Sequence, residues 1–161
     1  MKTLYVLRHG QAAPESEVAS DHERVLTRRG RTEVQRAAAC LLERGSLPSL
    51  VLSSSATRAR QTAELCCAAW PAGIELVIVE GLYLAGPGSY LTALAARADS
   101  QRAAMVVGHN PGLEALVHRL TERSEHLATA SFVEIELPIE AWSQLSGVGH
   151  GQGRLVHAFR P

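Results

Sequence analysis

The sequence has little of what defines several large classes of protein. Its 16 Lys and Arg residues are balanced by 16 Asp and Glu, so the 161-residue chain lacks the net positive charge typical of proteins that bind nucleic acid or an anionic membrane surface. No apolar run is long enough to span a bilayer, and because Met1-Lys2 leads straight into a short strand pattern we expect no secretory signal. We therefore expect a cytoplasmic protein that binds neither nucleic acid nor membrane.

Cysteine is scarce as well. The three cysteines are Cys40, Cys66 and Cys67. An odd number, with two of them adjacent in an apolar helical pattern, predicts reduced thiols rather than a disulfide framework. No CxxC spacing occurs, and neighbouring helical residues point in different directions, so these residues predict no metal site. The length favours a single domain over residues 1–161 with room for a hydrophobic core.

What is present is an alternation of strand and helix patterns. Apolar runs and alternating patterns predict strands at 3–7, 50–52, 74–79, 103–107, 131–137 and 154–159. Helices are predicted to begin at Thr27, after the serines 53–55, at a cap on Ser89, and at an Asn110 cap with Pro111 as the first helical residue. The glycine-rich stretch 147–153 lacks the Lys-Ser/Thr ending of a phosphate loop and predicts a hairpin connection. Together these patterns predict an α/β fold with a mostly parallel sheet flanked by helices.

The first strand ends in Leu7-Arg8-His9-Gly10, the most informative stretch of the chain. A guanidinium beside an imidazole at the end of a buried strand is costly unless an anion offsets the desolvation. A phosphoryl group fits, because Arg presents a planar fork of donors to its oxygens and His presents a ring nitrogen that can attack phosphorus. An Arg-His-Gly tripeptide is common, however, and needs support from elsewhere in the chain.

That support comes from two other strands that end in the same way. The strand at 50–52 runs through serines to Arg58 in the first turn of a helix, and the strand at 103–107 runs into His109. Because ligand sites in open α/β sheets form beyond the carboxyl ends of the strands, the topology predicts that Arg8, His9, Arg58 and His109 meet at one edge. Two guanidiniums, two imidazoles and helix N-termini at one place predict a phosphoryl pocket.

These residues resemble the histidine phosphatase superfamily. The matching segments are Leu7-Arg8-His9-Gly10, the SSxxxRAxQT-like run Ser53-Ser54-Ser55-Ala56-Thr57-Arg58-Ala59-Arg60-Gln61-Thr62, and Gly108-His109-Asn110-Pro111. The short chain looks most like the SixA-type phosphohistidine phosphatases, since the phosphoglycerate mutases of the superfamily carry insertions that are missing here. The resemblance implies a three-layer sandwich of the phosphoglycerate mutase-like type. Ala56 stands where proline is common, and Ala12 where Ser or Thr is common, which leaves the substrate open.

The resemblance also implies a mechanism and roles for the site residues. A neutral His9, its pKa lowered by adjacent cations and its tautomer fixed by a backbone carbonyl near Gly10, would attack phosphorus and become a phosphohistidine. Arg8, Arg58 and His109 would bind the phosphoryl oxygens, with no metal or other cofactor. Glu80 stands where the superfamily often has an acidic proton donor, and a solvated glutamate at a strand end is the equal alternative.

The substrate remains open between two classes. A phosphohistidine on a partner protein is the first choice, and a small phosphorylated molecule is the second. Two further alternatives are a phosphate-binding module without catalysis and a metallohydrolase that uses His9 and His109. Gln11 and the polar loop at 11–24 either border the site or form plain surface.

Overall fold

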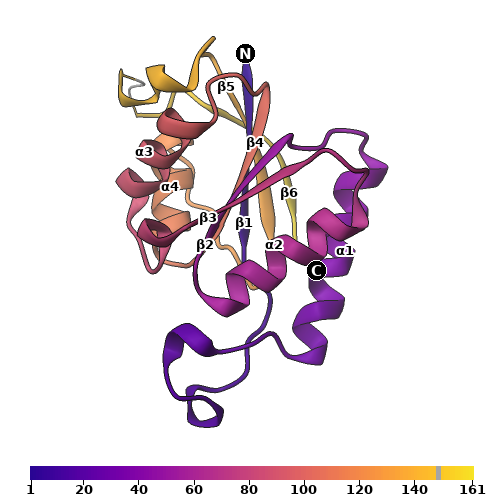
Figure 1. The fold of residues 1–161 in the computed structure, drawn as a ribbon. Coiled ribbons are helices and arrows are strands. Elements are labelled where there is room, and N and C mark those ends of the chain that lie inside the picture. Colours follow the sequence, from indigo (N-terminus) through magenta and orange to yellow (C-terminus); the bar gives the residue numbers. More distant parts are fainter. Residues whose placement is uncertain (148–149) are drawn as a thin grey trace.

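The computed structural model describes residues 1–147 and 150–161, and these form one mixed sheet between two layers of helices (Figure 1). The sheet order is β3 (Glu75–Val79), β2 (Leu50–Ser54), β4 (Ala103–Gly108), β1 (Lys2–Arg8), β5 (Phe132–Leu137) and β6 (Arg154–Phe159). Neighbours among β1 to β4 pair in parallel, whereas β5 runs antiparallel to both β1 and β6. The predicted α/β fold with a mostly parallel sheet is confirmed.

Helices cover both faces of this sheet. On one face lie α1 (Arg28–Glu43) and α2 (Thr57–Ala69), and on the other lie α3 (Pro87–Arg97) and α4 (Gly112–Thr121) (Figure 1). Short 3₁₀ turns complete the described elements: η1 (Glu15–Glu17), η2 (Asp21–Glu23), η3 (Glu80–Leu82) and η4 (Trp142–Gly147). Among the helices described, none combines the length and the apolar character needed to cross a bilayer.

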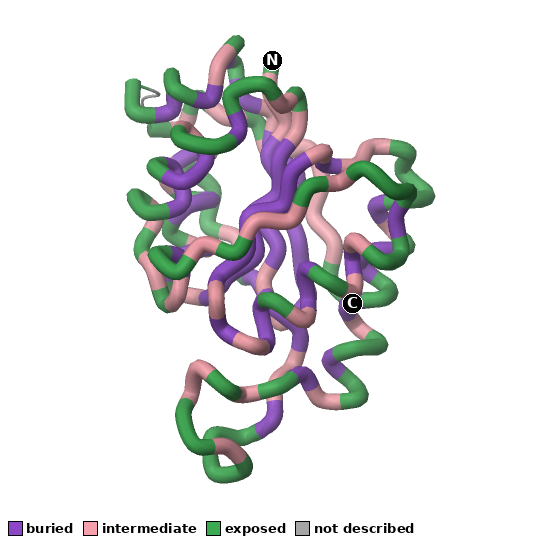
Figure 2. The backbone as a smooth tube through the Cα atoms, viewed as in Figure 1, coloured by how far each residue is buried: buried purple, intermediate pink, exposed green. Residues whose placement is uncertain are grey.

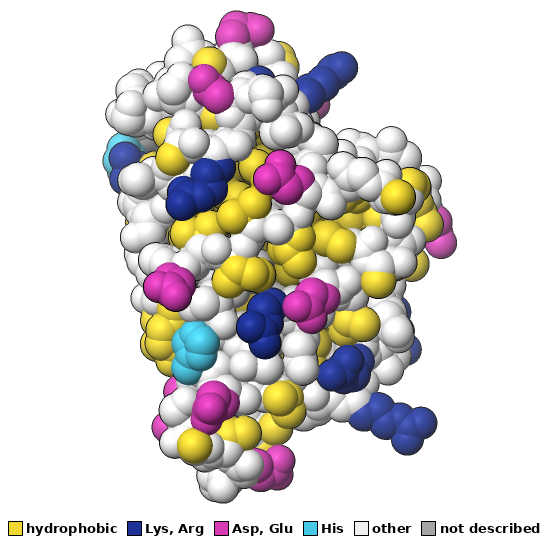
Figure 3. Space-filling view, in the orientation of Figure 1, with side chains coloured by type: hydrophobic (Ala, Val, Ile, Leu, Met, Phe, Trp, Pro, Cys, Tyr) yellow, Lys and Arg dark blue, Asp and Glu magenta, His cyan; other side chains and the backbone are white. Residues whose placement is uncertain are grey.

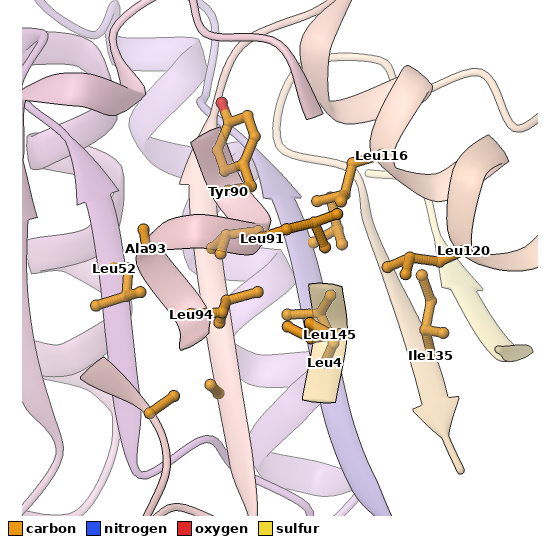
Figure 4. Close-up of a cluster of buried hydrophobic side chains, with 14 of the residues drawn as sticks. Leu4, Leu52, Tyr90, Leu91, Ala93, Leu94, Leu116, Leu120, Ile135 and Leu145 are labelled. Carbon is orange, nitrogen blue, oxygen red and sulfur yellow. The ribbon is translucent and has the colours of Figure 1, made fainter. Parts of the chain in front are cut away.

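The strands alternate side chains between two hydrophobic cores. In β1, Leu4 and Val6 pack toward α3 and α4, whereas Tyr5 and Leu7 pack toward α1 and α2. The central strands are buried on both faces, as expected of a sheet covered by helices (Figure 2). Figure 4 shows the first of these cores, in which side chains of α3 and α4 meet those of β1, β2 and β5.

Two predicted helix starts are wrong and two are confirmed, one of them that of α2, which begins at Thr57 after the serines 53–55. Thr27 is the N-cap of α1, where its hydroxyl accepts a hydrogen bond from the Gly30 N–H at 2.9 Å. Ser89 lies inside α3, which begins at Pro87, because a proline without an N–H suits the first helical position. Neither Asn110 nor Pro111 takes its predicted place, since Pro111 is the N-cap of α4 and follows a cis peptide bond.

The remaining connections agree with the sequence where they are described. Strands β5 and β6 pair as an antiparallel hairpin, and the predicted connection at 147–153 lies between them, although Val148 and Gly149 fall outside the described residues. The segment 11–26 extends beyond the end of the sheet, below the strands in Figure 1. On the face drawn in Figure 3, charged side chains of both signs are interspersed, in keeping with a net charge of zero.

Candidate active site

The four residues that the sequence singled out at strand ends lie around one cavity. Arg8, His9, Arg58 and His109 line a cavity of about 370 Å³ beyond the carboxyl ends of β1, β2 and β4. The parallel register places Arg8 opposite Gly108, and the rings of His9 and His109 therefore lie with their centroids 5.2 Å apart. Their meeting at a single edge of the sheet is as predicted.

His9 is held in a defined tautomer. Its Nδ1 lies 2.7 Å from the carbonyl oxygen of Gly10, which can only accept, so Nδ1 carries the proton. Its Nε2 is unprotonated and accepts a hydrogen bond from Arg58 Nε at 3.3 Å, and the His9 side chain lines the cavity. Burial is the main cause that lowers the pKa of His9 to about 4, with the nearby arginines adding to it. The ring is therefore neutral near pH 7, although burial contributes more than the adjacent cations that the sequence pointed to.

Arg58 connects three parts of the site. Only 3% of its side chain is exposed, and it lies in the first turn of α2. Besides the contact with His9, its Nη1 donates to the backbone oxygen of Asp21 at 2.8 Å and its Nη2 donates to Asp21 Oδ2 at 3.1 Å. The same Nη2 lies 3.4 Å from His109 Nδ1.

Asp21 is a site residue that the sequence reasoning missed. It begins η2 in the loop after β1, and its carboxylate also accepts hydrogen bonds from Tyr83 Oη at 2.5 Å and Arg24 Nη1 at 3.1 Å. The bond from Tyr83 is the largest cause that holds the pKa of Asp21 far below its usual range, with Arg24 and Arg58 adding to it, so the group is ionised. No spacing in the sequence marked it, because two of its partners, Arg58 and Tyr83, come from distant segments of the chain.

His109 is oriented by β2 and α3. Its Nε2 lies 2.8 Å from Ser54 Oγ, and because Nδ1 faces the donor Arg58, Nε2 carries the proton toward the serine. Burial, followed by the proximity of His9 and Arg58, lowers the pKa of His109 to about 3. The preceding residue must be glycine, since a Cβ on Gly108 would lie 2.0 Å from Tyr90 Oη.

The other residues of the second motif join the loops to α2. The hydroxyl of Thr62 accepts from the Gly10 N–H at 3.0 Å and donates to the Arg58 carbonyl oxygen at 2.7 Å. Gln61 Oε1 accepts from the Leu26 N–H at 2.8 Å. These contacts bind the turn after β1 to the helix that carries Arg58, which gives a structural reason for the length of the motif.

The glycine inside α1, which helix propensity does not explain, is required by packing. A Cβ on Gly30 would lie 2.1 Å from the carbonyl oxygen of Gln11, and a Cβ on Gly10 would lie 2.8 Å from the carbonyl oxygen of Gly30. The turn after His9 therefore rests directly on the first turn of α1.

Glu80 is not brought to the cavity. It is exposed at the start of η3 and does not line the space between the four central residues. The loop at 11–24 does border the site, since Gln11, Ala12, Asp21 and Arg24 line it. Leu84, 58% exposed and with a φ of +48°, lines the same cavity. Across residues 1–147 and 150–161, no cluster of three or more His, Cys, Asp or Glu side chains is arranged to hold a metal ion.

Comparisons with known proteins agree with this geometry. Residues 4–83 match the family model of the histidine phosphatase superfamily, branch 1. The uncharacterized protein Rv1276c of Mycobacterium tuberculosis is 34% identical over 147 residues, which cover 89% of each chain. The chain belongs to the histidine phosphatase superfamily.

Solved structures show which members of this superfamily the chain is similar to. A protein assigned as SixA from Nakamurella multipartitia is 27% identical with a TM-score of 0.83, covering 99% of this chain and 96% of the other. The protein histidine phosphatase SixA in complex with tungstate is 26% identical with a TM-score of 0.79, covering 97% and 95%. The fold is SixA-like, and the family and these neighbours support a phosphatase activity.

Proposed function

We propose that the chain, acting as one domain over residues 1–161, hydrolyses phosphohistidine on a partner protein through a covalent intermediate on His9. The observation that carries this proposal is the His9 ring, whose Nδ1 donates to the Gly10 carbonyl while the unprotonated Nε2 accepts a hydrogen bond from Arg58, which the phosphoryl group would replace. A buried, neutral imidazole beside guanidiniums is suited to attack a phosphoryl group. The neighbour described as a protein histidine phosphatase supports a protein substrate, and its tungstate supports a tetrahedral oxyanion as the ligand.

The reaction has two displacements at phosphorus. In the first, His9 Nε2 forms a bond to phosphorus while the bond to the substrate imidazole breaks, and that imidazole takes up a proton from solvent. In the second, a water oxygen forms a bond to phosphorus while the bond between His9 Nε2 and phosphorus breaks. Inorganic phosphate leaves, one proton returns to solvent, and His9 is again neutral with Nδ1 protonated. Arg8, Arg58 and His109 bind the equatorial oxygens, and the dianion favours a protonated His109 once it is bound.

The proposal needs no metal ion, since guanidinium groups already supply the positive charge. Because Glu80 does not line the cavity, we propose it as a proton donor only for substrates with a poor leaving group that extends beyond the cavity toward η3. An imidazole leaves with less acid help than an alkoxide and does not need this donor. The three free cysteines, of which Cys66 is fully buried with a raised pKa, support a reducing compartment such as the cytoplasm.

Trapping the intermediate tests the central step. The chain is mixed with a protein labelled at phosphohistidine, quenched in alkali because phosphohistidine is labile to acid, and analysed by peptide mass spectrometry. We expect label on His9, none in His9→Ala, and unaltered labelling in the control His118→Ala, whose side chain is exposed. Absence of label in the unaltered chain would favour a phosphate-binding module without catalysis.

A substrate panel separates the remaining alternatives. Turnover of the labelled protein is compared with turnover of sugar and nucleotide phosphates, with and without a chelator and vanadate. Faster turnover of small phosphates would favour a small-molecule phosphatase, and loss of activity with the chelator would favour a metallohydrolase. We expect Arg58→Ala and His109→Ala to leave a severely weakened enzyme.

A further inference from the structure

Glu114 lies in the first turn of α4, and one of its carboxylate oxygens accepts two hydrogen bonds and lies close to a histidine. Its Oε1 accepts from Asn110 Nδ2 at 2.9 Å and from the Leu127 N–H at 2.9 Å, and it lies 3.1 Å from His126 Nδ1. A single carboxylate oxygen thus joins the turn after β4 to the segment that precedes β5.

The backbone carbonyl oxygen of Leu127, whose N–H binds Glu114, is hydrogen-bonded as well. It accepts from Arg8 Nη1 at 2.9 Å and from Asn110 Nδ2 at 2.8 Å. The Leu127 residue is therefore bound through its N–H to Glu114 and through its carbonyl to Arg8 and Asn110. The Asn110 amide bridges the two acceptors.

Arg8 depends on this arrangement for its position. Among the described residues, the bond to Leu127 is the hydrogen bond that its guanidinium makes, and its buried Nε has no partner. A long arginine side chain loses considerable rotamer freedom when it is fixed, so a site that needs it in one place must anchor it. The negative charge of Glu114 also offsets the burial of Arg8, because it opposes the lowering of the Arg8 pKa that desolvation causes.

We infer that Glu114 is a positioning residue that acts through Leu127 and Asn110 to hold Arg8 toward the phosphoryl group. The inference rests on the proposed function, since it assigns Arg8 to phosphoryl binding. It predicts that Glu114 affects the affinity for oxyanions without touching the ligand.

The test measures vanadate affinity by calorimetry, together with kcat and KM on a phosphohistidine protein. Replacing Glu114 by Ala removes the acceptor, and we expect roughly tenfold weaker vanadate binding, the usual size for a lost hydrogen bond to a charged group. Replacing it by Gln keeps an oxygen that can accept, so most of the affinity should return. The matched control is Glu64→Ala, which removes an exposed glutamate on α2 that pairs with Arg60.

A double-mutant cycle with Arg8→Ala separates positioning from general stability. If Glu114 acts through Arg8, then Glu114→Ala has less than about a twofold effect on vanadate affinity once Arg8 is absent, because coupled residues are not additive. An equal loss in both backgrounds would overturn the inference, and so would unaltered affinity in Glu114→Ala. If Glu114→Ala does not fold, Asn110→Ala breaks the same bridge and should show the same coupling to Arg8.

Failure of the proposed function gives a different result. In that case the unaltered chain binds no vanadate and His9 carries no label. Vanadate binding and labelling in the unaltered chain, with no effect of Glu114, would instead overturn only the role of Glu114.

Discussion

Lowering the pH from 7.5 to 5 is expected to destabilise the fold through His9 and His109. Both rings are buried, with 8% and 2% of the residue exposed, and burial is the main reason why their pKa values fall to about 4 and about 3. The groups that face them are mostly positive. Arg58 and Arg8 oppose protonation of both rings, whereas Asp21 favours protonation of His109.

The sign follows from proton binding. In the unfolded chain a histidine has a pKa of about 6.5, so between pH 4 and 6.5 the unfolded state binds protons that the folded state does not. Stability from these rings is therefore complete above pH 6.5 and is lost as the pH falls. At pH 5 each ring should lower the free energy of unfolding by about 2 kcal/mol relative to pH 7.5, which gives about 4 kcal/mol for the pair. Asp21 has a lowered pKa, so its contribution is lost only at more acidic pH.

Urea unfolding at pH 5, 6 and 7.5 measures this effect. The buried Trp70 and Trp142 provide a fluorescence signal. The double variant His9→Asn/His109→Asn should lose most of the pH dependence, while a variant at the exposed His118 should keep it. If the double variant and the unaltered chain lose the same free energy between pH 7.5 and 5, the reasoning about burial is refuted.

Three further changes test single residues. Gly30→Ala should lower the melting temperature by an amount equivalent to about 2 kcal/mol, because the new Cβ would lie 2.1 Å from the Gln11 carbonyl oxygen, and thermal denaturation measures it. Asp21→Asn should tighten vanadate binding in calorimetry, because it removes the anion that competes for Arg58. Glu80→Gln should leave phosphohistidine turnover within about twofold in a steady-state assay and slow the hydrolysis of alkyl phosphates, which need an acid.

Each change has a control or a contrary outcome. Gly88→Ala in α3 has open space around the new Cβ and should be neutral or stabilising by up to about 1 kcal/mol. Weaker vanadate binding by Asp21→Asn would mean that this carboxylate orders its loop rather than competing with the ligand. If Glu80→Gln slowed the hydrolysis of phosphohistidine and of alkyl phosphates equally, a role limited to poor leaving groups would be contradicted.

The parts of the site that could be predicted from the sequence are those fixed by backbone topology. Arg8 ends β1, His9 and His109 follow β1 and β4, and Arg58 follows β2. The common direction of these parallel strands brings the four residues together once each strand is recognised. The tautomer of His9 was also predictable, because its acceptor is the next residue along the chain.

The residues that could not be predicted depend on contacts between distant loops. Asp21 meets Arg58, Tyr83 and Arg24, and nothing in a polar segment of the sequence specifies which charge will turn inward. The predicted start of α4 at an Asn110 cap is wrong for a related reason. Asn110 has the residue type of a helix cap, but its amide bridges Glu114 and the Leu127 carbonyl, and acceptors so far apart in sequence leave no local pattern.

The contacts of Arg58 make the loop at 11–24 part of the binding energetics. A phosphoryl group placed between His9 and Arg58 would lie beside the ionised Asp21, because Arg58 contacts both His9 and Asp21. Two neighbouring anions repel each other. Binding therefore requires Arg58 to exchange part of its contact with Asp21 for contacts with phosphoryl oxygens. The Asp21 carboxylate keeps its bonds from Tyr83 and Arg24 during this exchange, so the loop need not unfold. Substrate affinity then depends on how strongly those two residues hold Asp21 away from Arg58, and changes at Tyr83 should alter KM more than kcat.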